Sequence, residues 1–335
     1  MPEEILTRKE DLTYASRDVT DFLSEGRFIV LGHKEPDGDC ASSQIVMASY
    51  LKRLGRETVL LSQGPFDRPE IADFEKYFLK DFKESDIREG DKVIVLDCST
   101  IDRLGNFQYL PGKLPSLVID HHSSGEPFGN LKIIDPKAPS VTYIVERLIR
   151  ELGHTLKREE AELLLFGICT DTGFFRHLDD GAVEVLSAVI GLVEVGATLK
   201  KAYYMMYGNR ELSKRKMLGK MLERAKSYAG NRLIVTYQTI ADREAVEGKS
   251  RGEDELYMLL QTVRNNEVVA FIREESSTGC SVGLRSRNRI DVGKIARDFG
   301  GGGHKLASGF DMDGSIEEVE RVVVEKLLPL LKPRY

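Results

Sequence analysis

Four short, almost continuously apolar runs within the first 120 residues constrain the fold of this chain most strongly. They cover residues 27–32 (RFIVLG), 57–62 (ETVLLS), 92–97 (KVIVLD) and 115–120 (PSLVID). A strand that is apolar on both of its faces is typical of a parallel sheet covered by helices on both sides. These runs therefore predict the buried strands of one parallel sheet.

A helical pattern follows the strand-like runs. Ser140 offers an N-cap oxygen at its start, and Gly153 can end it. Between them, apolar residues recur three and four positions apart, at Val141, Ile144, Val145, Leu148, Ile149 and Leu152. The alternation of strands and helices predicts an α/β fold with a doubly wound, mostly parallel sheet.

The length of 335 residues is typical of two domains. A second strand-rich stretch starts at Asn231 with RLIVTY and ends in the apolar helical pattern VERVVVEKLLPLL. The tyrosine-rich and basic stretch before it is typical of one long charged helix between domains. We expect a doubly wound domain in residues 1–195, a helical linker in residues 196–229, and a smaller α/β domain in residues 230–335 across a cleft from the first.

The net charge of −6 and the isoelectric point near 5.7 argue against a protein that binds long duplex DNA, which needs a broad basic surface. The four cysteines, Cys40, Cys98, Cys169 and Cys280, form no CxxC pair and predict neither a disulfide framework nor a zinc cluster. The amino terminus shows no secretion signal. We therefore expect a cytoplasmic protein.

No association with a membrane is expected either. The most apolar stretch, from Ala182 to Leu199, contains Glu184 and Glu194, so we do not expect it to span a bilayer.

Carboxylate and imidazole side chains follow three of the predicted strands directly. They are His33, Asp37 and Asp39 after the first run, Asp97 at the end of the third, and Asp120, His121 and His122 at the end of the fourth. A further acid, Asp171, lies in the segment GICTDTG after a helical run. The carboxyl ends of parallel strands form the ligand crevice of an open sheet, so these side chains are expected to converge.

Converging carboxylates repel one another, and divalent cations offset that repulsion. Two cations about 3.5–4 Å apart can clamp the attacking and leaving oxygens of a phosphoryl transfer. Mixed histidine and aspartate ligands favour Mn²⁺, with Mg²⁺, Co²⁺, Fe²⁺ and Zn²⁺ left open. Taken singly, Asp37 and Asp39 also fit a plain turn around Gly38, and Asp97 fits a helix N-cap.

These segments resemble a known family. The runs HKEPDGD, LDCST, DHH and GICTDTG look like the four motifs of the DHH phosphoesterase superfamily, and GGGGHKLASGF (Gly300–Phe310) looks like the motif of its associated C-terminal domain. The length resembles the group of bifunctional oligoribonucleases and pAp phosphatases, the nanoRNases. The resemblance implies a catalytic first domain and a substrate-binding second domain.

The resemblance also implies a role for each matching residue. One metal ion would be held by His33, Asp37 and Asp97, and the other by Asp39, Asp97, His121 and Asp171, with Asp97 bridging the two. Asp120 would orient the neighbouring histidines. His122 would contact the scissile phosphate or protonate the leaving oxygen. A hydroxide bridging the two metals would attack phosphorus in line.

Three positions depart from the usual motifs. Ser42-Ser43 replaces a glycine–serine pair, Gly125 stands where an asparagine is common, and Ser308 replaces a small alanine. None removes an expected ligand. The change at Gly125 bears on how the loop after His122 is held.

The second domain carries a local basic region on an acidic chain. Between Ser281 and Lys305 there are six basic and two acidic residues. The glycine run beside it permits backbone amides to form an anion-binding nest, although a glycine run alone is often a simple turn. Together with the family motif, this region predicts a phosphate or nucleotide clamp made of Arg285, Gly301, Gly302, Gly303 and His304.

The sequence therefore predicts a metal-dependent phosphoesterase that hydrolyses short oligonucleotides or pAp to 5′-mononucleotides. A cyclic-di-AMP or pApA phosphodiesterase would use the same site with a different outer pocket. A manganese inorganic pyrophosphatase shares the metal motifs but lacks the glycine–histidine motif. A nucleotide-binding regulatory module with a silent site is the alternative from another class. Whether the protein is a homodimer is left open.

Overall fold

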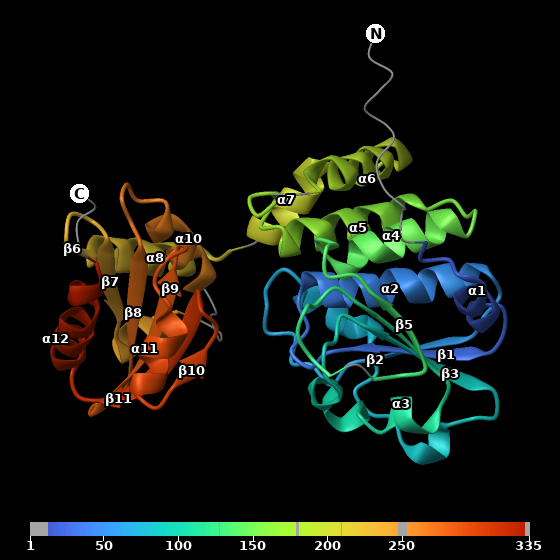
Figure 1. The fold of residues 1–335 in the computed structure, drawn as a ribbon, viewed down its shortest axis with the longest axis horizontal. Coiled ribbons are helices and arrows are strands. Elements are labelled where there is room, and N and C mark those ends of the chain that lie inside the picture. The colour runs from blue at the N-terminus through green and yellow to red at the C-terminus, as the bar shows by residue number, and fades with distance from the viewer. Residues whose placement is uncertain (1–12, 127, 179–180, 209, 247–252, 332–335) are drawn as a thin grey trace, which may run out of the picture. The chain divides into compact units, whose positions relative to one another are not determined.

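A five-stranded parallel sheet organises the first of two units, which divide between residues 209 and 210. The computed structural model describes residues 13–126, 128–178, 181–208, 210–246 and 253–331. The strands lie in the order β2-β1-β3-β4-β5 (Figure 1). Their bounds are β1 Arg27–Gly32, β2 Thr58–Leu61, β3 Asp91–Leu96, β4 Ser116–Asp120 and β5 Leu131–Ile134.

Four of these strands are the four apolar runs, which confirms the predicted parallel sheet. Residues 28–32 of β1 are all buried, as expected for a strand covered on both faces. The edge strand β5 was missed by the sequence analysis. Only Ile133 of its four residues is buried, so it lacks the continuous apolar signal.

Helices cover both faces of this sheet, so the fold is doubly wound as predicted. On one face, Phe28, Val30 and Ile94 pack against the helix layer. Figure 1 shows α2, α4 and α5 in this layer, with α6 and α7 outside it. On the other face, Ile29 and Val93 pack against a short helical stretch. The helices are α1 Arg17–Leu23, α2 Gly38–Arg53, α3 Leu110–Lys113, α4 Val141–Glu151, α5 Arg158–Asp171, α6 Ala182–Val195 and α7 Leu199–Tyr207, with 3₁₀ turns at Ala72–Tyr77, Glu84–Asp86 and Ile101–Phe107.

The helix α4 begins as its sequence predicts. The Ser140 side chain accepts a hydrogen bond from the Tyr143 amide at 3.1 Å and caps the helix. Gly153, with φ of 77°, follows its carboxyl end. The start of α4 is therefore fixed at residue 141, a position that matters for the site below.

The second unit is a six-stranded mixed sheet in the order β10-β11-β9-β8-β7-β6 between two sets of helices. Within this second sheet, β7 and β8 are the only neighbouring described strands that run parallel. The strands are β6 Lys226–Tyr228, β7 Leu233–Gln238, β8 Val268–Ser276, β9 Gly279–Ser286, β10 Gly302–Gly303 and β11 Ala307–Asp313. The helices are α8 Leu212–Glu223, α9 Ile240–Glu244, α10 Glu253–Gln261, α11 Val292–Asp298 and α12 Ile316–Leu327, followed by a 3₁₀ turn at Leu328–Leu330.

The single long helix expected between the domains is instead two helices, α7 and α8. Met206 of α7 packs in a core of the first unit, whereas Met217 of α8 packs in a core of the second. Each apolar face thus belongs to a different core, and the chain leaves helical geometry at Gly208 to serve both. The expectation of one charged connecting helix was wrong because it ignored these two faces.

Candidate metal centre

The carboxyl ends of β1, β3 and β4 lie side by side because these strands are neighbours in the sheet. The chain continues from β1 to β2 on one side and reaches β3 on the other, so the strand order reverses between β1 and β3. Such a switch point is where open α/β sheets bind ligands. His33 follows β1, Asp97 follows β3 and Asp120 ends β4, so these residues meet at this edge.

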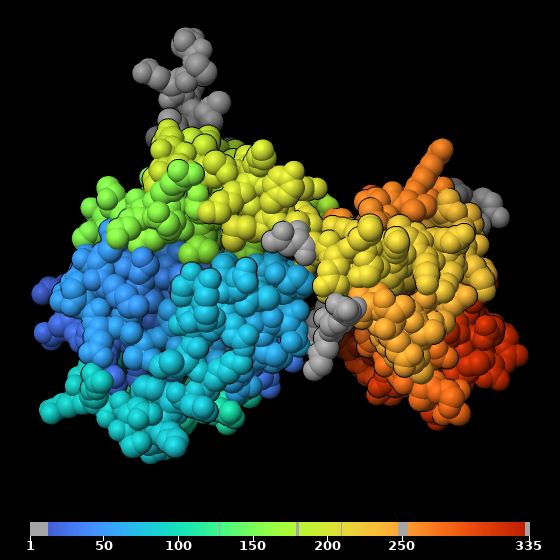
Figure 2. Space-filling view, turned by 180° about the vertical axis from the view of Figure 1, so that it is seen from behind, coloured from blue at the N-terminus to red at the C-terminus, as the bar shows by residue number. Residues whose placement is uncertain are grey.

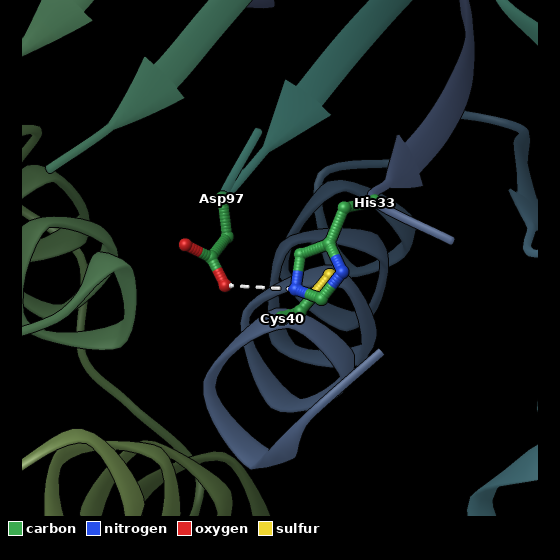
Figure 3. Close-up of side chains that lie close together, drawn as sticks. All are labelled: His33, Cys40 and Asp97. Carbon is green, nitrogen blue, oxygen red and sulfur yellow. Dashed lines mark ion pairs between the residues drawn. The ribbon is translucent and has the colours of Figure 1, made fainter. Parts of the chain in front are cut away.

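Asp97 lies at the centre of the site. Its side chain is buried, and its backbone has a φ of 57°, a left-handed conformation that is uncommon for a residue with a side chain. Its Oδ2 is 3.5 Å from His33 Nε2, the pair joined in Figure 3, and its Oδ1 is 3.7 Å from His121 Nε2. Oδ1 has no hydrogen-bond partner within the described part of the chain. A buried carboxylate oxygen in this state is costly unless a cation binds it, so the site fits a metal ion.

The two histidines beside Asp97 are oriented alike. The Nδ1 of His33 is 2.7 Å from the carbonyl oxygen of Lys34, and the Nδ1 of His121 is 3.2 Å from that of Ala138. Each Nδ1–H thus donates to a backbone carbonyl, and each Nε2 faces carboxylates. Metal-binding histidines are held in this way by a bond from the second ring nitrogen.

Asp37 forms the turn that the sequence left open for it and also faces the candidate site. It is the N-cap of α2, where its Oδ1 accepts hydrogen bonds from the amides of Asp39 and Cys40 at 3.1 and 3.0 Å. Its Oδ2 lies 3.9 Å from His33 Nε2. One oxygen therefore fixes the turn while the other faces the site.

Asp39 is fully buried and joins α2 to the amino end of α4. Its Oδ2 accepts a hydrogen bond from the Val141 amide at 2.6 Å. Its Oδ1 accepts from the amide and the hydroxyl of Thr142 at 2.8 and 2.5 Å. These bonds stabilise the carboxylate at the positive end of the helix dipole.

Three groups of donor atoms could hold metal ions, with the atoms of each group within 4.8 Å of one another. The first is Asp39, His121 and Asp171, and the second is Asp97 with His121 and His122. The third is His33, Cys40 and Asp97. Five of the six expected metal ligands belong to these groups, and Asp97 belongs to two of the three. The sixth, Asp37, is in none of them but lies beside His33.

The pKa values reflect an excess of negative charge. Burial raises the pKa of Asp39, and the neighbouring Asp171 and Asp97 raise it further. Burial also raises the pKa of Asp171 to about 6, against the opposing hydrogen bond from His121. Burial alone would raise the pKa of Asp97, but the hydrogen-bonded His33 holds it below its usual value. Cations suit such a cluster because they stabilise every carboxylate at once.

His122 is held by Asp120. Asp120 Oδ1 lies 2.8 Å from His122 Nδ1 and also accepts a hydrogen bond from the His121 amide at 2.9 Å. The His122 side chain is 35% exposed, so its ring reaches solvent beside the buried cluster. The hydrogen bond to Asp120 raises the pKa of His122.

In the second unit, the nominated residues lie at one end of the sheet. Arg285 of β9 pairs in register with Ala307 of β11, and β11 pairs Ser308 with Gly303. The Arg285 guanidinium lies 4.5 Å from the centre of the Tyr257 ring.

The glycine run differs from the expected nest of free amides. The amide of Gly301 donates to the carbonyl of Ala296, and the amide of Gly300 donates to that of Arg297. These glycines end α11, so their amides already have partners. Gly302, Gly303 and His304 are exposed, and they remain the accessible part of the motif.

A hollow of about 410 Å³ opens beside this motif in the second unit. Aromatic rings, glycines and a few polar side chains line it. The polar residues are Arg273, Ser281 and Asp311, the rings are Tyr257, Phe271, Phe299 and Phe310, and the glycines are Gly283, Gly300, Gly301 and Gly309, with Val282 completing the wall. Arg285 and His304 are not part of this lining.

Comparisons with known proteins agree with this geometry. The DHH family, N-terminal domain model matches residues 27–168, and the DHHA1 domain model matches residues 254–328. Over 312 residues the chain is 30% identical to the bifunctional oligoribonuclease and PAP phosphatase NrnA of Thermus thermophilus, which covers 90% of this chain and 91% of that protein. The chain belongs to the DHH family.

Solved structures share this DHH fold. An exopolyphosphatase-related protein from Bacteroides fragilis superposes with a TM-score of 0.82 at 23% identity, covering 94% of this chain and 97% of that one. Exonuclease RecJ bound to manganese superposes with a TM-score of 0.53 at 17% identity, covering 94% of each chain. At these identities, the two superpositions show a shared fold and nothing further.

Cys40 and Thr142 belong to the site of this DHH protein but were not nominated. Cys40 lies on α2, and its thiol lies beneath the His33 ring (Figure 3). Burial raises the pKa of this thiol to about 11. The only sequence signal for Thr142 was its place in the first turn of a capped helix.

Proposed function

We propose that this DHH protein is a metal-dependent phosphoesterase that hydrolyses short oligonucleotides and pAp to 5′-mononucleotides. The observation that carries the proposal is the buried Asp97 carboxylate, whose Oδ2 faces His33 and whose Oδ1 faces His121 without a hydrogen-bond partner in the described part of the chain. The name of the Thermus relative, an oligoribonuclease and PAP phosphatase, supports the choice of substrate.

The residues that would hold two divalent cations are already adjacent. His33, Asp37 and Asp97 would hold one, and Asp39, Asp97, His121 and Asp171 the other. Mn²⁺ is our first choice, in keeping with the manganese in the RecJ structure and with the mixed nitrogen and oxygen donors. When bound, such a pair of cations supplies Lewis acidity and an activated water for phosphoryl transfer.

The chain itself supplies proton transfer and binding. His122, whose Nδ1 contacts Asp120, would contact the scissile phosphate or donate a proton to the leaving oxygen. In the second unit, Arg285 and the exposed part of the glycine–histidine motif provide charge and hydrogen-bond donors for a further phosphate. A few such contacts suit a short substrate better than a long strand.

A hydrolysis panel with Mn²⁺ tests the proposal. The substrates are pAp, a dinucleotide, cyclic-di-AMP, a long single strand and pyrophosphate. We expect turnover of pAp and the dinucleotide, and loss of it in Asp97→Asn but not in the control Asp102→Asn, which changes an exposed carboxylate. Preferred hydrolysis of cyclic-di-AMP or pyrophosphate would replace the proposed substrate class.

A calorimetric titration with Mn²⁺ separates catalysis from a silent site. Tight Mn²⁺ binding with turnover of no substrate in the panel would favour a nucleotide-binding regulatory module. Equal turnover in Asp97→Asn would contradict the proposed centre itself.

A further inference from the structure

The helix α6 presents apolar side chains on two opposite faces. Val185, Ala188, Val189 and Leu192 are buried in the core of the first unit. On the outer face Val183, Leu186, Ile190 and Val193 are 74%, 46%, 60% and 44% exposed. A helix that is apolar all round is normally covered on all sides, so the outer face lacks a partner within the described part of this chain.

A lipid surface suits this face poorly. Within the described residues, no single helix has the length and apolar character to cross a membrane, and α6 with α7 meets that test only as a pair bent by 103°. The only charged side chains of α6 are Glu184 and Glu194. Helices that lie on membranes carry Lys and Arg on their polar face, because the lipid surface is anionic.

The spacing of the exposed residues favours a second copy of the same helix. Val183, Leu186, Ile190 and Val193 are separated by three, four and three positions, the spacing at which two helices pack along a seam. The pattern reads the same in both directions about residue 188. A two-fold axis there would place Val183 against Val193 of the second copy and Leu186 against Ile190, as an isologous interface requires.

The charges of α6 complement this antiparallel arrangement. The same axis places Glu194 beside the amino end of α6 in the second copy. That end is preceded by Gly181, which has no side chain to cap the helix. The amides of its first turn carry a partial positive charge that a carboxylate stabilises. Each copy would thus add a second carboxylate to an end whose first turn already carries Glu184.

The neighbouring helix α7 carries further exposed apolar side chains. Stable interfaces bury on the order of 1,200–2,000 Å² in total, more than one pair of four-turn helices provides. Leu199, Tyr203 and Tyr204 of α7 are also exposed and apolar. Figure 2 shows the α6–α7 segment, in yellow-green to yellow, along one border of the first unit.

We propose that α6 is the core of a two-fold symmetric homodimer interface, in which antiparallel copies bury Val183, Leu186, Ile190 and Val193. This inference uses no residue of the metal centre and stands apart from the proposed hydrolysis.

Sedimentation equilibrium of the full chain tests the interface. We expect a dimer for the wild type and for the control Leu212→Glu, which changes a 69% exposed leucine on α8. Ile190→Glu places two like charges beside the axis, so we expect the dissociation constant of the dimer to rise at least about 100-fold. Far-ultraviolet circular dichroism checks that each variant is folded. A wild-type monomer at all concentrations, or a dimer unaffected by Ile190→Glu, would overturn the proposal.

Disulfide trapping tests the antiparallel pairing even if Ile190→Glu does not fold. Val183→Cys and Val193→Cys are mixed and oxidised mildly, and the four native cysteines are buried and do not compete. We expect the mixture to cross-link more than either variant alone. Cross-linking of each variant only with itself would indicate another geometry. A monomeric wild type that floats with phosphatidylcholine vesicles would assign the face to lipid instead.

Discussion

The carbonyl oxygen of Ser99 lies 2.2 Å from the place where a Cβ of Gly125 would stand. Ser99 comes two residues after Asp97, and Gly125 comes three residues after His122. The loop that follows the DHH triplet therefore rests on the backbone that positions the central carboxylate. The glycine that departs from the usual motif is what permits this close contact.

Gly125→Ala should weaken both the fold and the metal centre. The residue has a φ of 136°, and its added Cβ would collide with backbone rather than with a flexible side chain. We expect a loss of about 1–3 kcal/mol in the free energy of unfolding and weaker Mn²⁺ binding. Urea unfolding and calorimetry measure the two effects. Gly112→Ala, at a glycine with open space around it, is the matched control, and equal behaviour of the two variants would refute the contact.

Thr142→Val should lower metal affinity while leaving α4 in place. The variant removes the hydroxyl that donates to Asp39 Oδ1 at 2.5 Å but keeps the backbone bond to the same oxygen. Loss of a group that orients a metal ligand costs about 10- to 100-fold in affinity. Titration with Mn²⁺ measures it, and Thr142→Ser should restore most of the loss. An unchanged affinity in Thr142→Val would mean that the hydroxyl serves helix capping alone.

The ion pair between Arg27 and Asp91 should make the free energy of unfolding depend on pH in the acid range. Arg27 Nε and Nη2 contact the two Asp91 oxygens at 2.7 and 2.6 Å and join β1 to β3. Burial acts to raise the pKa of Asp91, but the hydrogen bonds from Arg27 and from the Arg88 amide bring it below its usual value. The stabilisation is therefore complete above the unfolded pKa of about 3.9 and is lost as the pH falls through the lower folded value.

Asp91→Asn tests this pair. At pH 7 we expect the free energy of unfolding to fall by about 2–4 kcal/mol, because Arg27 stays buried without its charged partner. Denaturant titrations between pH 7 and pH 2 measure the free energy of unfolding of both proteins. The difference between Asp91→Asn and the wild type should become smaller only below pH 4. A difference that is constant over that range would mean that the Asp91 charge contributes nothing.

Arg285→Ala should separate substrate capture from chemistry. We expect KM for pAp and dinucleotides to rise about 10- to 100-fold, the loss of one charge-assisted hydrogen bond, with kcat little changed. Hydrolysis of a small aryl phosphodiester should be nearly unaffected. Arg287→Ala, at an exposed arginine two residues along the same segment, is the control. Equal losses on both substrates would exclude a nucleotide-binding role for Arg285.

The parts of the fold that followed from the sequence are those with a local signal. Continuous apolar runs marked four strands, and Ser140 marked the start of α4. The strand β5 gave no such signal because it lies at an edge with one buried residue. The break between α7 and α8 was missed because Met206 and Met217 belong to different cores, a tertiary property that helical periodicity does not contain.

In the candidate site, too, some features followed from a sequence rule and others depended on contacts between distant residues. The placement of Asp97 and His121 followed from the rule that parallel strands end at a common edge. The bond between Asp39 and Thr142 spans 103 residues, and no spacing rule predicts it. The amide of Gly301 was expected to face an anion, but it bonds to the last turn of α11 instead. A glycine after a helix fits either an anion-binding turn or a helix end, and the sequence does not distinguish the two.

The attachment of α4 to Asp39 has a consequence for how this protein can evolve. The helix rests on the sheet through its apolar side and binds the Asp39 carboxylate, a proposed metal ligand, through its first amides. A shift of the helix along its axis would therefore displace that carboxylate. Substitutions at buried positions far along α4, such as Ile149, would then alter ion affinity before they unfold the protein. If the proposed ions bind here, the need to keep them bound would restrict sequence change at these remote buried positions as much as the need for a stable core does.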